Sequence, residues 1–147
     1  MSKSNLYEQD FYAWANEQAN LLRTGQVSAA DIEHIAEEIE SMGKTEKREL
    51  VSRLTVLLLH LLKWHFQPIY RGASWRLSIA NTRDQLADHL ADNPSLKAKM
   101  TEAIASAYRY ARRDAARETN LDVATFPADC PWTVDQMMDA DFWPDQH

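Results

Sequence analysis

The stretch LTVLLLHLLKWHFQPIYRGASW, residues 54–75, decides the fold. Up to Phe66 it has a helical pattern in which apolar residues cover more than half of the circumference, so we expect other helices to surround it. At about 100° per residue, the positions that point inward are Leu54, Leu57, Leu58, Leu61 and His65. His60 and Lys63 fall at the rim of this apolar face. Pro68 then ends the helix, because a proline disfavours helical geometry in the residue before it.

The composition is also that of a helical protein. The chain of 147 residues has only three Gly and five Pro, and its abundant Ala, Leu, Glu, Gln and Arg favour helix. A chain of this length normally forms one domain. We therefore predict a single all-α domain over residues 1–147, a compact bundle of five main helices around the central apolar helix.

Caps and stops place these five helices at about 7–24, 28–42, 45–66, 74–91 and 95–118. Asn5 is expected to cap the first helix, Gly25 to end it in the left-handed conformation, and Gly43 to separate the second from the third. The second helix carries a narrow apolar seam, which consists of Ile32, Ile35, Ile39 and Met42.

From about residue 119 the helical core gives way to an irregular tail rich in Pro and aromatic residues. Phe126, Trp132 and Trp143 are costly to leave in water. We therefore expect the tail to wrap back over the helices. Thr133 and Gln136 have the spacing of a cap for one short helix within it.

Charge and cysteine content narrow the compartment and the partners. The net charge of −6 argues against a nucleic acid as the default partner, because phosphate binding requires positive charge. The single Cys130 cannot form an internal disulfide and fits a reducing compartment. The N-terminus lacks the apolar core of a signal peptide, and the longest apolar run, Val56 to Leu59, is far shorter than the ~20 residues of a membrane helix. We expect a soluble cytoplasmic protein without membrane contact.

Four motifs resemble those of a known bacterial family. They are ESMGKTEKREL (40–50), LLLHLLKWHFQP (57–68), SWRLSI (74–79) and FPADCPWTVDQMMDADFWP (126–144). Together with DFYAW near the start, they are similar to family 29 of the domains of unknown function and cover nearly the whole chain. The resemblance implies an all-helical fold and no established activity, cofactor or partner. The motif positions are Glu37, Glu38, Glu40, His60, Lys63, Trp64, Pro68, Trp75 and Arg83, and the resemblance assigns none of them a chemical role.

Arg83 is the sharpest single anomaly in the helical pattern. It projects among Ile79, Leu86 and other apolar residues on the side of its helix that should be buried. A buried guanidinium needs a carboxylate or carbonyl partner. We predict an ion pair with Glu37 or Glu40 of the second helix, and binding of a small anion is the alternative.

A metal site is a second possibility for the acidic edge. Glu33, Glu37 and Glu40 lie along one flank of the isoleucine seam, and such a run is normally a solvated edge. If His60 faced Glu37 or Glu40, carboxylate and imidazole ligands would suit Zn, Fe or Mn. These three residues are weak candidates, because the chain contains no HExxH motif.

Two further groups of residues are candidates for binding. The junction around residues 67–74 lies between Trp64 and Trp75, and its polar and aromatic side chains could line a pocket. The face of the fifth helix carries Arg109, Arg112, Arg113 and Arg117. Acidic neighbours dilute this face, so a solvated surface is the default reading and nucleic-acid binding the alternative.

No catalytic motif is visible, whether a nucleophile elbow, a phosphate-binding loop or a dinucleotide fingerprint. We therefore interpret the protein as a non-catalytic cytoplasmic helical module, without cofactor, that acts through contacts with an unidentified protein or through self-association. The surplus of aromatic residues suits an interface. The alternatives are a metal-binding protein or small hydrolase using Glu37, Glu40 and His60, and a nucleic-acid-associated protein using the Arg109/Arg113 face.

Overall fold

The computed structural model of the protein describes residues 3–145, and the described chain is all-α, as predicted. Its α-helices are α1 (Lys3–Gln9), α2 (Phe11–Arg23), α3 (Ile32–Phe66), α4 (Ala73–Asp92), α5 (Met100–Thr119) and α6 (Val134–Met138). Short 3-10 helices connect them: η1 (Val27–Ala29), η2 (Pro68–Tyr70), η3 (Pro94–Lys99) and η4 (Val123–Thr125). Among the described helices, every one is too short or too polar to cross a bilayer.

The chain packs as two compact units, Met1–Thr45 and Glu46–His147. The continuous helix α3 contributes residues to both of them. The single domain over residues 1–147 stays a prediction, and each unit has its own internal packing.

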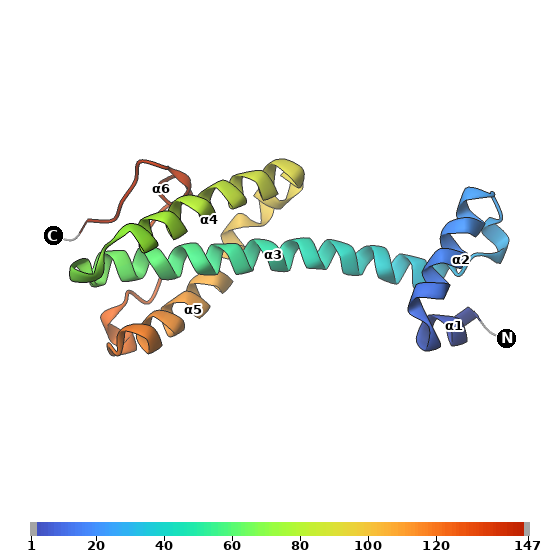
Figure 1. The fold of residues 1–147 in the computed structure, drawn as a ribbon, viewed down its shortest axis with the longest axis horizontal. Coiled ribbons are helices and arrows are strands. Elements are labelled where there is room, and N and C mark those ends of the chain that lie inside the picture. The colour runs from blue at the N-terminus through green and yellow to red at the C-terminus, as the bar shows by residue number, and fades with distance from the viewer. Residues whose placement is uncertain (1–2, 146–147) are drawn as a thin grey trace. The chain divides into compact units, whose positions relative to one another are not determined.

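The core of the C-terminal unit forms around the apolar half of α3. Its fully buried leucines are Leu50, Leu54, Leu57, Leu58, Leu61 and Leu62. In Figure 1, α4 and α5 lie along two sides of this half of α3. Helix α4 contributes the fully buried Ile79 and Leu86, whereas α5 contributes a stripe of small side chains at positions 103, 107, 111 and 115. Small contact residues allow a short distance between helix axes, so α5 packs closely on the core.

The C-terminal tail folds back onto this core, as expected from its aromatic residues. Phe126 and Met137 are fully buried, and the Trp143 ring lies 4.7 Å from that of Trp64. Thr133 and Gln136 form the predicted reciprocal cap at the start of α6. The tail is therefore part of the core of the C-terminal unit.

The predicted boundaries at the start of the chain are wrong. The first helix is interrupted at Asp10, whose carboxylate accepts a hydrogen bond from the amide of Ala13 and caps α2. Asn5 lies within α1, so it does not stand before the first helix as predicted. Gly25 does adopt the left-handed conformation, with φ of 75°, which a residue without a Cβ reaches at no steric cost.

The predicted break at Gly43 is also wrong, because α3 runs through it. A glycine inside a helix costs only about 1 kcal/mol relative to alanine. The strong helix formers on both sides outweigh this cost. The fifth helix begins later than predicted, because residues 94–99 form the 3-10 helix η3 before α5.

Candidate functional site

The apolar seam at the start of α3 is exposed. Ile32, Ile39 and Met42 are 53%, 63% and 68% exposed, and only Ile35 of the seam is half-buried. The 35-residue helix α3 therefore buries one end of its apolar surface in the core of the C-terminal unit and leaves the other end open to solvent.

The seam is exposed because α1 and α2 pack against a different face of α3. That face presents Asp31, His34 and Glu38, which lie about a quarter turn from the seam around the helix. Trp14 donates its indole N–H to Asp31 (3.1 Å), and the Tyr7 hydroxyl donates to Glu38. The rings of Tyr7 and His34 stack at 4.0 Å. The N-terminal unit thus uses polar and aromatic contacts for its own packing.

This network shifts the pKa values of its members. The hydrogen bond to Glu38, together with burial, raises the pKa of Tyr7 to about 12. Burial acts to raise the pKa of Asp31, but hydrogen bonds from His34 and Trp14 outweigh it and lower the pKa. The bond to Asp31 raises the pKa of His34 against the opposite effect of burial. Asp31 is therefore held as a carboxylate, and the Tyr7 hydroxyl is held in its protonated form.

The exposed seam is bordered by acidic side chains. The carboxylates in residues 31–40 are Asp31, Glu33, Glu37, Glu38 and Glu40, and this stretch contains no Lys or Arg. Residues 1–45 together carry eight Asp or Glu and three Lys or Arg. Asp31 and Glu38 lie on the face that α1 and α2 cover, whereas Glu33, Glu37 and Glu40 are exposed. The solvent-facing surface of this part of α3 is therefore negative next to the apolar seam.

A second polar cluster lies within the C-terminal unit, where α4 crosses α3. Glu46 and Glu49 are neighbours on one face of α3, and His89 of α4 is 8% exposed beside them. One ligand atom from each of these three residues lies within 4.8 Å of the others. They line an open cleft of about 460 Å³ together with Arg53, Gln85, Asp88, Asp92 and Asn93. Among the described residues, this is the group that offers three potential metal ligands.

Arg83 is buried, as its position among apolar residues predicts, at 4% exposure. The predicted partners were wrong. Instead of Glu37 or Glu40, the guanidinium binds backbone carbonyls of the tail, donating to Met137 (2.7 Å) and Phe142 (2.8 Å). These two carbonyl oxygens accept no hydrogen bond from within a regular helix, so each needs another donor. Arg83 therefore fastens the tail to α4 and is a structural residue.

The remaining candidates of the central helix are placed separately. His60 donates a hydrogen bond from Nδ1 to the carbonyl oxygen of Val56 in its own helix, at 2.8 Å. Glu37 and Glu40 belong to the N-terminal unit and His60 to the C-terminal unit, so a metal site that joins the three stays a prediction. Trp64 is 6% exposed under the Trp143 ring. The Lys63 ammonium lies over the Trp75 ring, 5.0 Å from the ring centre. Trp75 also borders a cavity of about 620 Å³.

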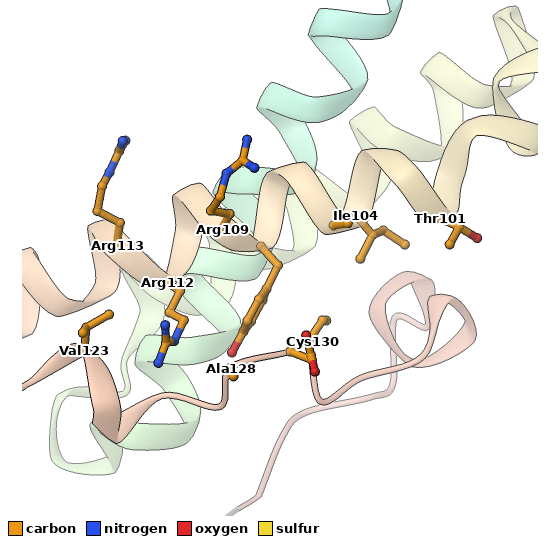
Figure 2. Close-up of a pocket in the computed structure, with 11 residues that line it drawn as sticks. Thr101, Ile104, Arg109, Arg112, Arg113, Val123, Ala128 and Cys130 are labelled. Atoms are coloured by element: carbon orange, nitrogen blue, oxygen red, sulfur yellow. The ribbon is translucent and has the colours of Figure 1, made fainter.

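The arginine face of α5 is divided by the tail. Figure 2 shows Arg112 extending towards the tail segment, with Arg109 and Arg113 extending from another side of the helix. Arg112 donates to the carbonyl of Phe126 at 3.1 Å, so it is not part of a free basic face. Arg109 and Arg113 both lie over the ring of Tyr110, at 5.2 and 5.3 Å. Nucleic-acid binding through Arg109 and Arg113 stays a prediction.

The motifs and the fold agree with the family comparison. The family model described as "Domain of unknown function DUF29" matches residues 6–143. The chain therefore belongs to this family. Comparison with curated proteins and with solved structures gave no match. Membership confirms the resemblance of the motifs and assigns no chemical role to any residue.

Sequence reasoning missed His89 and the carboxylates beside it. The available signal was the pair Glu46 and Glu49, three residues apart on a helix, followed by a histidine on the next helix. It was hidden because His89 falls beside the expected apolar stripe of α4 and because the sequence does not say where α4 crosses α3. Only the crossing of α3 and α4 brings the three side chains together.

Proposed function

We propose that this protein is a non-catalytic interaction module whose exposed α3 seam binds a basic amphipathic helix of a partner protein. The observation that supports the proposal is the exposure of Ile32, Ile39 and Met42. Fully burying a side chain of this size contributes about 1.5–3 kcal/mol. A partner that covers the exposed parts of these three side chains therefore gains a substantial binding free energy.

The spacing of the seam favours a helix as the occupant. Ile32, Ile35, Ile39 and Met42 alternate by three and four residues, which is the narrow stripe that two helices share in a coiled coil. A partner with the same spacing can place its apolar side chains between them. This mode of binding lays the apolar face of one helix against another.

The charge of the surface favours a basic partner over a second copy of this chain. A second copy would bring the same exposed carboxylates, Glu33, Glu37 and Glu40, near an interface where like charges repel. Lys or Arg side chains that flank the apolar stripe of a partner would instead pair with them. Electrostatic complementarity of this kind supplies specificity and speeds association.

We also propose a cytoplasmic location for this activity. Cys130 is a free, half-buried thiol, and burial raises its pKa. A thiol kept in this protonated form suits a reducing compartment, where structural disulfides are rare.

The test uses two synthetic helical peptides with identical apolar heptad positions, one with Lys and one with Glu at the flanking positions. Binding to the full chain is measured by fluorescence anisotropy. The Lys peptide should bind and weaken as salt rises, and the Glu peptide should not bind. Ile39→Gln should weaken binding at least tenfold, whereas Ile69→Gln, which changes an 85% exposed side chain in η2, should not.

Two results would contradict the proposal. Equal binding of both peptides would show that charge does not select the partner. A stable dimer in sedimentation experiments that Ile39→Gln dissociates would make a second copy the occupant.

A photo-reactive residue at position 39 identifies the cellular partner, and the cross-linked segment must be a basic amphipathic helix.

A further inference from the structure

We infer that Glu46, Glu49 and His89 form a binding site for a divalent transition-metal ion, with Zn²⁺ as its best representative. The site is separate from the proposed docking seam and lies wholly within the C-terminal unit. It joins two neighbouring carboxylates of α3 to a buried imidazole of α4.

The orientation of the His89 ring is the first argument. Nε2 lies 2.9 Å from the backbone carbonyl oxygen of Glu46. A carbonyl oxygen only accepts, so Nε2 must carry the proton. In the neutral ring the lone pair then belongs to Nδ1. Metal-binding histidines are typically held in this way, with one ring nitrogen donating to a carbonyl or carboxylate and the other free for the ion.

The surroundings of Nδ1 are the second argument. It faces Oε2 of Glu49 at 3.6 Å, and in the neutral ring both atoms are acceptors. Two lone pairs placed face to face in a largely buried position repel unless a positive charge lies between them. Either a proton on the ring or a metal ion supplies that charge. The lining of the cleft, which includes Asp88 and Asp92 as well, adds negative potential that attracts a cation.

Arg53 orients the Glu49 carboxylate and binds the oxygen that the metal ion would not use. Its Nη2 binds Oε1 of Glu49 at 2.5 Å, while Nη1 binds Gln85 at 2.8 Å. Oε2 remains directed at His89. An outer residue that orients a metal ligand through its second atom is a regular part of metal sites.

The ligand set indicates the kind of metal. One imidazole and two carboxylates suit Zn²⁺, Mn²⁺ or Fe²⁺ better than Ca²⁺ or Mg²⁺, which prefer oxygen ligands. Ligands about 2.1 Å from a zinc ion lie at most about 4.2 Å apart, slightly closer than the 4.8 Å limit within which one ligand atom of each residue falls. The Glu46 carboxylate lies 3.7 Å from Nε2 of His89, so its side chain has to turn towards Nδ1 to reach the ion. Glu46 and Glu49, with side chains 44% and 39% exposed, have the freedom to close this gap.

The test is zinc titration of the full chain after removal of metal with a chelator, followed by calorimetry and elemental analysis. One zinc ion should bind per chain. Glu49→Gln and His89→Gln should each weaken binding at least tenfold. His60→Gln is the matched control, because that ring bonds within its own helix, and it should change the affinity less than twofold.

A second readout guards against misfolding of the His89 variant. Zinc should shift the Nδ1 resonance of His89 in the wild-type chain, and Glu46→Gln, which alters a half-exposed side chain, should weaken this response without loss of helical circular dichroism. If zinc does not bind saturably, or binds equally well to the Glu49 and His60 variants, the inference is overturned. His89 would then serve to join α4 to α3 through its hydrogen bond to the Glu46 carbonyl.

Discussion

Replacing Arg83 with alanine should release the C-terminal tail and destabilise the C-terminal unit. The side chain is 4% exposed and forms short hydrogen bonds to Met137 (2.7 Å) and Phe142 (2.8 Å). Its guanidinium also lies 5.6 Å from the centre of the Trp143 ring. The substitution removes all of these contacts and leaves the tail carbonyls without their donor.

The size of the effect follows from these contacts. A hydrogen bond from a charged donor contributes about 1.5–3 kcal/mol. The third bond, to Gln136 at 3.4 Å, adds little at that length. Burial opposes the two strong bonds, because it lowers the pKa of Arg83 and so disfavours the charged form. We expect a net loss of about 3 kcal/mol, which corresponds to a fall in Tm of about 6–12 °C for a chain of this size.

The loss is measured by urea unfolding, and the release of the tail by hydrogen exchange of the amides of residues 134–143. Arg83→Lys keeps the charge but not the forked geometry, so it should lose about half as much. Arg76→Ala is the control, because that arginine of α4 is exposed and its guanidinium lies over the Trp64 ring, 5.5 Å from the ring centre. The reasoning is refuted if Arg83→Ala costs no more than Arg76→Ala, or if the tail amides keep their protection.

Three further predictions concern the rest of the chain. Leu58→Ala should destabilise the protein by about 2–5 kcal/mol in urea unfolding, because the side chain is fully buried; a loss below 1 kcal/mol would contradict its place in the core. Gly43→Ala should stabilise by about 0.5–1 kcal/mol, since the added methyl group meets nothing within 4 Å, whereas Gly25→Ala should destabilise because of its φ of 75°. The pKa of His34 should lie above 6.5 by NMR titration and fall in Asp31→Asn. Because folding raises the pKa of His34, the contribution of its pairing with Asp31 to stability is complete below pH 6.5. This contribution disappears as the pH rises through the pKa of His34 in the folded protein. An unchanged His34 titration in Asp31→Asn would rule out the pairing.

Much of the fold could be predicted because its signals are local. The period of the apolar residues identified the central helix, and Pro68 and Gly25 ended their helices as expected. The reciprocal cap of Thr133 and Gln136 formed as its spacing indicates. Each of these features depends on residues a few positions apart, so neighbouring side chains and backbone preferences determine it.

The errors arose where a local rule met a longer-range effect. Gly43 weakens a helix locally, yet α3 continues through it because the helix formers on either side outweigh the cost. Asp10 can occur within a helix or cap one, and here it starts α2. The seam of Ile39 and Met42 has the period of a buried stripe, but periodicity does not state which face its neighbours will cover.

The sequence alone determined that this protein is all-helical, that residues 54–66 form its apolar axis, that Arg83 is buried and that the chain has the motifs of its family. Only the tertiary structure decided what these residues meet. The tail, more than fifty residues further along the chain, supplies the carbonyls for Arg83. The crossing of α3 and α4 brings Glu46, Glu49 and His89 together. The reason is physical: the period of apolar residues defines which side of a helix avoids water, whereas the choice of partner depends on how complete helices and the tail fill the remaining space.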